Sequence, residues 1–194
     1  MTAFEYVMVL VSIIIALAIA HLLTAVSASI HRLRGQGERI ELDAVYILWI
    51  GYVLIWLISF WWWEFKFQDV IAEWSYGLYL FIVIYSILLF MLATVLVPHR
   101  MQGVTSSYDY FMQGRKWFFS VLLLVQAVDI VDTFLKGYEW GVRPEALGIY
   151  AVTIFVAITG LIFERRSIQL GAASVGFAAL LLYQFQELGV LGSW

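Results

Sequence analysis

Long apolar stretches alternate with short polar connections along almost the whole chain. A hydrocarbon core of roughly 30 Å is crossed by about 20 helical residues, and six stretches are close to that length. They cover residues of about 4–30, 44–63, 77–97, 117–136, 146–163 and 168–187. The pattern predicts an all-α polytopic membrane bundle of six transmembrane helices, in a single integral membrane domain over residues 1–194.

The composition agrees with a chain whose main partner is the lipid bilayer. Hydrophobic residues make up 63% and charged residues 13% of the sequence, whereas a soluble domain is about 45–50% apolar and about 25% charged. No basic stripe is present, so nucleic-acid binding is not expected. The chain has no cysteine, which excludes disulfides, thiol nucleophiles and cysteine-based metal sites.

Basic residues are unevenly divided between the connections. Three connections, 31–43, 98–116 and 164–167, carry most of the arginine and lysine, whereas the other two carry Lys66, Lys136 and Arg143. By the positive-inside rule, the three basic connections are expected to be cytoplasmic and both termini to be outside. The connection 98–116 is the longest polar stretch, and we expect it to offer a contact surface for a cytoplasmic protein partner.

The fourth apolar stretch carries Gln126, Asp129 and Asp132. An aspartate near the membrane centre costs about 2.5–3.5 kcal/mol on insertion scales, so these residues must be offset by the surrounding apolar ones. Their successive i,i+3 spacing places all three on one helix face. That face is expected to look into protein or a watery cavity rather than into lipid.

Two interpretations of these carboxylates are open. If the orientation is right, Glu64, Gln184 and Glu187 fall near the same outer side and would form an outward-facing acidic site for protons or small cations. Alternatively, Lys136 follows Asp132 by four residues and simply pairs with it. The two interpretations weigh equally for Asp132, whereas the deeper Asp129, which has no cation on its own helix, favours a functional role.

His21 lies within the first apolar stretch, on a face of mostly small side chains. One interpretation is a neutral histidine hydrogen-bonded across helices; the other is a proton relay or ligand connected to the aspartates. No second histidine lies at the same depth, so haem ligation is not expected. No nucleophile, metal or phosphate-binding motif is present either, so we expect no enzyme activity, no cofactor and no metal site.

The last two apolar stretches are rich in small residues, and Ala172 and Gly176 form a small-xxx-small pair. Such pairs allow two helices to approach closely, either inside one chain or between copies. Internal packing is the more common use, although we expect the protein to form a homo-oligomer.

Several short motifs resemble those of a widespread family of small, uncharacterised six-helix bacterial inner-membrane proteins. The motifs are Glu5-Tyr6, Ser12, Ala20-His21-Leu22-Leu23, Trp62-Trp63, Pro98, Tyr110-Phe111 and Arg115-Lys116-Trp117-Phe118-Phe119. The resemblance spans most of the chain. It implies six helices and a multi-pass location in the bacterial inner membrane, and it implies no activity.

Three functions are compatible with these patterns. The leading hypothesis is an intramembrane site, centred on Asp129 and Asp132, that binds or conducts protons or small cations. The second is a non-transporting scaffold or accessory subunit of a protein complex. The third is a pocket for a lipid-like or quinone ligand beneath the tryptophans at 61–63.

Overall fold

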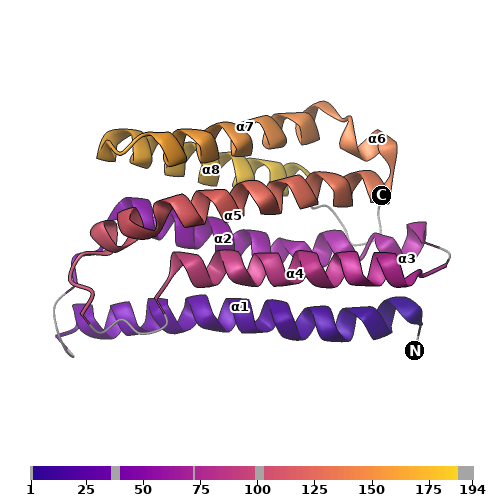
Figure 1. The fold of residues 1–194 in the computed structure, drawn as a ribbon, viewed down its shortest axis with the longest axis horizontal. Coiled ribbons are helices and arrows are strands. Elements are labelled where there is room, and N and C mark those ends of the chain that lie inside the picture. The colour runs from indigo at the N-terminus through magenta and orange to yellow at the C-terminus, as the bar shows by residue number, and fades with distance from the viewer. Residues whose placement is uncertain (1, 36–39, 72, 99–102, 188–194) are drawn as a thin grey trace.

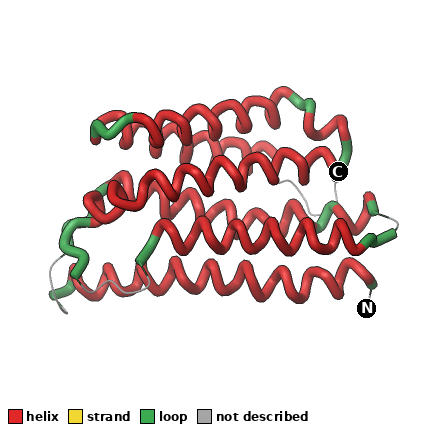
Figure 2. The backbone as a smooth tube through the Cα atoms, viewed as in Figure 1, coloured by secondary structure: helices red, strands yellow, loops and turns green. Residues whose placement is uncertain are grey.

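The computed structural model describes residues 2–35, 40–71, 73–98 and 103–187, and six long helices account for most of them. These are α1 (Ala3–Leu33), α2 (Ala44–Glu64), α4 (Tyr76–Leu96), α5 (Ser107–Lys136), α7 (Pro144–Ile162) and α8 (Arg166–Glu187). Two short helices, α3 (Phe67–Val70) and α6 (Tyr138–Gly141), follow α2 and α5. Over the described ranges there is no strand (Figure 2). All six long helices are long and apolar enough to cross a membrane, which confirms the all-α, six-span prediction.

One predicted boundary is wrong. The connection predicted over 98–116 is helical from Ser107 onward, so α5 begins well before residue 117. Ser106 caps this helix by accepting a hydrogen bond from the backbone N–H of Asp109 at 3.2 Å. Phe111 and Arg115 are buried against the rest of the chain, so tertiary packing stabilises the first turns of α5, which are too polar to be recognised as part of a span.

Short polar side chains fix where other helices begin. Thr2 and Glu5 form a reciprocal capping box at the start of α1. Asp43 accepts a hydrogen bond from the backbone N–H of Val45 at 2.8 Å and so caps α2. Pro144 occupies the first turn of α7, where its missing N–H costs nothing.

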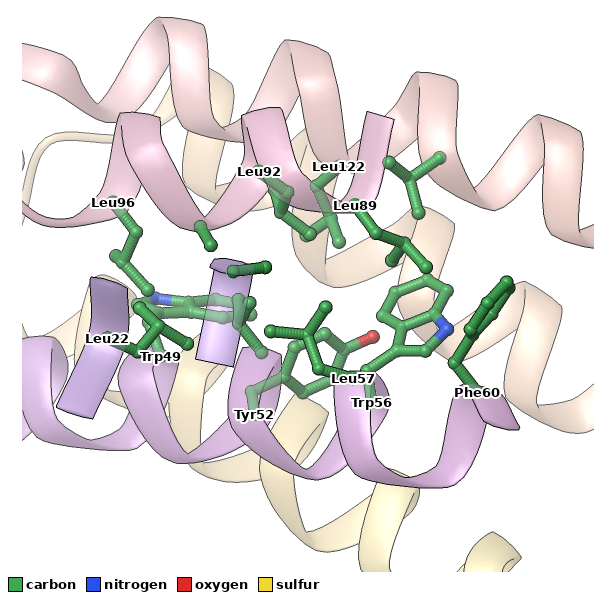
Figure 3. Close-up of a cluster of buried hydrophobic side chains, with 14 of the residues drawn as sticks. Leu22, Trp49, Tyr52, Trp56, Leu57, Phe60, Leu89, Leu92, Leu96 and Leu122 are labelled. Atoms are coloured by element: carbon green, nitrogen blue, oxygen red, sulfur yellow. The ribbon is translucent and has the colours of Figure 1, made fainter. Parts of the chain in front are cut away.

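The helices form a bundle in which α2 is central. Half of the most apolar part of α2 is buried, against a third for each of the other spans. It packs against α8, α1, α4 and α5, while α5 and α8 both pack on α7 and α1 packs mainly on α4 (Figure 1). Large side chains of α2 interlock with leucines of its neighbours in Figure 3, which labels Leu22, Trp49, Tyr52, Trp56, Leu57, Phe60, Leu89, Leu92, Leu96 and Leu122.

Small residues are used for close packing inside the chain. Ala172 and Gly176 of α8 are both buried, and a Cβ on Gly176 would lie 3.4 Å from Val156 of α7 and 3.5 Å from Trp49 of α2. At Gly160 of α7 the approach is tighter, because a Cβ there would overlap the ring of Phe119. The small-xxx-small pair of α8 therefore serves packing within the chain.

The described parts of the three connections that carry most of the basic residues lie at one end of the bundle, while α1 begins, and α3 and α6 lie, at the other (Figure 1). We call these the arginine-rich end and the α3/α6 end. At the arginine-rich end, Arg166 of α8 donates to the Asp43 carboxylate at 2.5 Å. Arg115 of α5 pairs with Glu164, just after α7, at 2.5 Å. The ends of α2 and α8, and of α5 and α7, are thus tied together.

Candidate functional site

A buried ion cluster lies at the α3/α6 end, where α2 and α5 both finish. The ammonium of Lys136, the last residue of α5, donates to Glu64 Oε1 at 2.7 Å and also to Asp132 Oδ2. The side chains are 4%, 1% and 3% exposed in the order Lys136, Glu64 and Asp132. Burying a charge without a partner costs several kcal/mol. Each of the three charged side chains is therefore stable in this buried position only because the others are there. The Lys136–Asp132 pair that the i,i+4 spacing suggests is present.

Asp129 lies one helical turn deeper and has different partners. The hydroxyl of Tyr85 on α4 donates to Asp129 Oδ1 at 2.7 Å, and the side-chain amide of Gln126 donates to Oδ2 at 3.1 Å. Both donors are neutral. Neither of these two contacts brings an ammonium or guanidinium group to the carboxyl group of Asp129. The carboxyl group is therefore able to hold a proton or to bind a small cation.

Asp129 and Asp132 face a cavity of about 60 Å³ enclosed by α2, α5, α7 and α8. Its polar lining includes Lys66, Gln126, Asp129, Asp132, Thr133, Lys136, Arg143, Thr153 and Gln184, and its aromatic lining Tyr52, Trp56, Trp63, Trp140, Tyr150 and Tyr183. A water molecule needs about 10–15 Å³ of such space, so the volume suits about four to six waters. Ligand pockets for drug-sized molecules are about 300–1,000 Å³, so this cavity is smaller than such a pocket.

Two oxygen atoms on the cavity wall point to water inside it. Asp132 Oδ1 and the hydroxyl of Tyr150 are buried and have no hydrogen-bond partner among the described protein atoms. Burying such a group without a hydrogen bond costs about 1–3 kcal/mol. Internal waters usually satisfy groups of this kind and make about three hydrogen bonds each. The cavity wall is therefore polar and offers hydrogen-bonding atoms that water can use.

Positive side chains also line this cavity, next to Trp140 of α6. Lys66 Nζ lies 2.5 Å from the centroid of the Trp140 ring, and the Arg143 guanidinium lies 4.9 Å from the same ring. Lys66 is buried, whereas the Arg143 side chain is 38% exposed and lies 3.8 Å from Glu145. Two aspartates and three basic residues, Lys136 included, therefore share the lining. Spacing along the sequence did not place Lys66 and Arg143 beside the aspartates.

The cavity is closed toward the arginine-rich end by aromatic side chains. The hydroxyl of Tyr52 and Thr153 Oγ1 lie 3.3 Å apart on this side of the cavity. One turn further along α2, the Trp49 ring packs edge to face on Phe118 and Phe119, with centroids 5.2 and 5.3 Å away. Trp49, Tyr52 and Trp56 follow one another along α2 in Figure 3. This aromatic layer separates the cavity from the arginine-rich end.

The structure brings together most of the residues that the sequence suggested. Gln126, Asp129, Asp132 and Gln184 line the same cavity, and Gln184 accepts a hydrogen bond from Trp63 Nε1 at 3.0 Å. Glu64 joins them through Lys136. The side chain of Glu187 lies outside the described part of the chain.

His21 is placed elsewhere. Its Nε2 lies 3.3 Å from the carbonyl oxygen of Val97, the residue that follows α4 near the arginine-rich end. It is not among the residues that line the cavity. The geometry matches a histidine hydrogen-bonded between helices, and it gives no contact between His21 and the aspartates.

Three participants were not found from the sequence. Tyr85 and Tyr150 sit inside apolar helices, where a tyrosine is an ordinary core residue and gives no signal. Lys66 was counted only as a charge on a connection, although it is buried. The sequence hints at the burial of Lys66 only through its position, two residues after the glutamate that follows an apolar stretch.

The tryptophans at 61–63 have tertiary partners. Trp61 Nε1 donates to Ser12 Oγ of α1 at 2.8 Å, and the Trp63 ring stacks on Tyr183 of α8 with centroids 5.8 Å apart. Trp61 and Trp63 thus fasten the end of α2 to α1 and α8. This role is in addition to the placement at headgroup level that tryptophans at span ends favour.

No metal-binding group of three or more histidine, cysteine, aspartate or glutamate residues occurs within the described ranges. No protein-family model matches this chain, and no significant match was found among curated proteins or among solved structures. Function has to be inferred from the geometry of the cavity itself.

Proposed function

We propose that this multi-pass membrane protein binds protons or small cations at Asp129, in a hydrated cavity reached from the α3/α6 end. The observation that carries the proposal is the pairing of Asp129 with two neutral donors, Tyr85 and Gln126, at the wall of that cavity. Ionisable groups inside a membrane are costly and usually mark proton or ion pathways. Asp132 is a poorer binding group because Lys136 already neutralises it.

Binding from one side is better supported than open conduction. A continuous path would have to pass the layer of Trp49, Phe118 and Phe119, whose rings pack edge to face. Release toward the arginine-rich end therefore requires a second conformation in which this layer separates. The ion pairs Asp43–Arg166 and Arg115–Glu164 join the same four helices that enclose the cavity, at the end toward which release would occur.

The decisive experiment follows protonation at Asp129 in the lipid-reconstituted protein. Infrared difference spectra recorded across a pH titration are expected to contain a carboxylic carbonyl band that Asp129→Asn removes. The matched control is Asp69→Asn, which changes an exposed aspartate of α3 and is expected to leave the band in place. A spectrum without any Asp129-dependent band at any pH would refute the proposal.

Flux measurements then separate binding from transport. Proteoliposomes with an imposed pH gradient are compared for wild type and Asp129→Asn. Faster dissipation by wild type alone indicates conduction through the site, and equal rates limit the protein to binding. The second candidate, a scaffold or accessory subunit, makes no use of the cavity and predicts that Asp129→Asn changes neither measurement.

The proposed orientation places the arginine-rich end in the cytoplasm and the α3/α6 end outside, because basic residues concentrate in the three connections at one end. The proposed location is the bacterial inner membrane, which rests on the sequence resemblance. We also propose that the protein forms a homo-oligomer in the bilayer and that the arginine-rich end carries the surface for a cytoplasmic partner. For the partner surface, the support is the order of this end of the bundle, where Glu41 makes backbone hydrogen bonds with Thr105 and Ser107.

A further inference from the structure

We propose that Glu64 and Asp132 share one bound proton and so form a second proton site, distinct from Asp129. Both carboxyl groups accept a hydrogen bond from the ammonium of Lys136, Glu64 through Oε1 and Asp132 through Oδ2. The side chains of Glu64 and Asp132 are 1% and 3% exposed. Their other oxygens, Glu64 Oε2 and Asp132 Oδ1, are buried and have no hydrogen-bond partner among the described protein atoms. Each carboxyl group is therefore left with one oxygen that Lys136 does not satisfy.

The two carboxyl groups are also within hydrogen-bonding reach of each other. Ionised carboxylates only accept, so a hydrogen bond between Glu64 and Asp132 forms only when one of them carries a proton. A buried charged acceptor without a donor is costly, and two carboxylates that share a buried site favour the state in which only one is ionised. A single proton between the two groups removes both costs.

Lys136 supplies one positive charge to this pair and can neutralise only one carboxylate at a time. In the singly protonated pair, one carboxylate balances the ammonium and the neutral acid adds no charge. An O–H bond forms on one carboxyl group and donates to an oxygen of the other. Both contacts with Lys136 persist, because a carboxylic acid still accepts at its carbonyl oxygen. The proton exchanges with the aqueous phase through the cavity that Asp132 lines.

Other titratable groups surround the pair. They are Asp129 and Lys136 of α5, Tyr52 of α2, Tyr85 of α4, Tyr150 of α7 and Tyr183 of α8. Lys66 and Arg143 line the same cavity, where both contact the ring of Trp140 and Arg143 also pairs with Glu145. A nearby cation weakens the repulsion between two carboxylates, but only a proton makes a hydrogen bond between them. The need for a proton therefore comes from the placement of the carboxyl oxygens rather than from the sum of charges around the cavity.

The test looks for the proton in an Asp129→Asn background, in which Asp129 contributes no carboxylic carbonyl band. Infrared spectra are recorded at about pH 6, where exposed carboxyl groups are ionised, in a detergent without ester groups. Glu64→Gln and Asp132→Asn are added one at a time, and each spectrum is subtracted from that of the background. The matched control is Glu73→Gln, which changes an exposed glutamate at the same end of the bundle.

We expect a carboxylic carbonyl band that Glu64→Gln and Asp132→Asn each abolish and that Glu73→Gln leaves in place. Both variants lose the band because removing either partner leaves a single carboxylate paired with Lys136. A band that only one of the two substitutions removes would overturn the proposal, since the proton would then belong to one residue. The absence of any such band from the Asp129→Asn spectrum would overturn it as well.

A second measurement covers a change of packing in the variants. In the Asp129→Asn background, the thermal unfolding midpoint should fall as the pH rises above about 6, because a proton held by the folded state but not by the unfolded chain stabilises the fold only while it is bound. Glu64→Gln, whose amide can donate to Asp132 in place of the acid, should reduce this fall, and Glu73→Gln should not. If both carboxyl groups are ionised, Glu64→Gln instead lowers the midpoint equally at every pH, and the proposal fails.

Both measurements are independent of the function proposed for Asp129, which is asparagine in all of these samples. A negative result removes the shared proton and leaves the Asp129 site in place. Failure to find the Asp129-dependent band of the wild type removes the Asp129 site and leaves the shared proton of Glu64 and Asp132 to be decided by the spectra above.

Discussion

The ammonium of Lys136 and the carboxylate of Glu64 lie 2.7 Å apart, although 72 positions separate them in the sequence. They meet because α2 and α5 end at the same depth of the bundle, one with the glutamate and the other with the lysine. Asp132, one turn earlier on α5, shares the same ammonium. One buried cation therefore holds two carboxylates in place beside the cavity that Asp129 faces.

Replacing Lys136 by methionine is expected to destabilise the protein strongly. The side chain keeps its apolar length, but two buried carboxylates lose their counter-charge, and removing one partner of a buried pair typically costs about 3–5 kcal/mol. The measurement is the thermal unfolding midpoint in detergent. Lys116→Met, at an exposed site on α5, is the control and should unfold like wild type. A Lys136→Met protein as stable as the control would show that the cluster is not held by charge pairing.

Tyr85 and Asp129 are expected to be energetically coupled. Tyr85→Phe removes the hydroxyl that donates to Asp129 at 2.7 Å and leaves the ring packing against Phe60 intact. A double-mutant cycle with Asp129→Asn, read as the free energy of unfolding, should give a coupling of about 0.5–3 kcal/mol, as for residues in one hydrogen-bond network. Additive effects of the two substitutions would mean that this hydrogen bond does not form in the membrane.

Gly160→Ala tests the contact between α7 and α5. A Cβ at this position would overlap the Phe119 ring, and Phe119 is completely buried against Trp49 and Phe111, so the ring has little room to move. Overpacking of this kind costs about 1–3 kcal/mol. Gly171→Ala is the matched control, because no atom lies within 4 Å of the place that its new methyl group would take; it should be neutral or slightly stabilising. Equal effects of the two substitutions would argue against the packing described.

At the arginine-rich end, the helix cap made by Asp43 should contribute more to the free energy of unfolding than the ion pair of Asp43 with Arg166. Asp43→Ala removes both the cap on Val45 and the partner of Arg166, and losing an N-cap costs about 0.5–2 kcal/mol. Arg166→Gln removes only the ion pair. Because the Arg166 side chain is 68% exposed, the loss should be about 0–1 kcal/mol, as for other surface ion pairs. Chemical denaturation of the two variants compares these losses, and a larger loss for Arg166→Gln would reverse the assignment.

The orientation is testable by labelling, since the natural chain has no cysteine to give a background. Thr105→Cys and Glu73→Cys each introduce one thiol at an exposed position, at the arginine-rich and α3/α6 ends respectively. In intact cells, a membrane-impermeant maleimide is expected to label Glu73→Cys at once and Thr105→Cys only after permeabilisation. The opposite pattern would place the arginine-rich end outside and invert the direction from which the cavity is reached.

The sequence by itself determined the helical class, the number of spans and the helix face that carries Gln126, Asp129 and Asp132. The physical reason is local, because hydrocarbon accepts only backbone that is hydrogen-bonded within its own segment or closed barrel, and helix length and face follow from residue spacing. The pairing of Lys136 with Asp132 is equally local, at i,i+4. These features needed no knowledge of neighbouring helices.

Tertiary structure alone decided the composition of the site. Tyr85, Lys66 and Arg143 come from other elements than α5 and converge on its polar face, and His21 is placed toward the opposite end of the bundle. Which helices become neighbours depends on how side chains interlock, as at Gly160 with Phe119 and Gly176 with Trp49, and this information is distributed over the whole chain. The contact between Tyr85 and Asp129 follows from that packing rather than from spacing along any one helix.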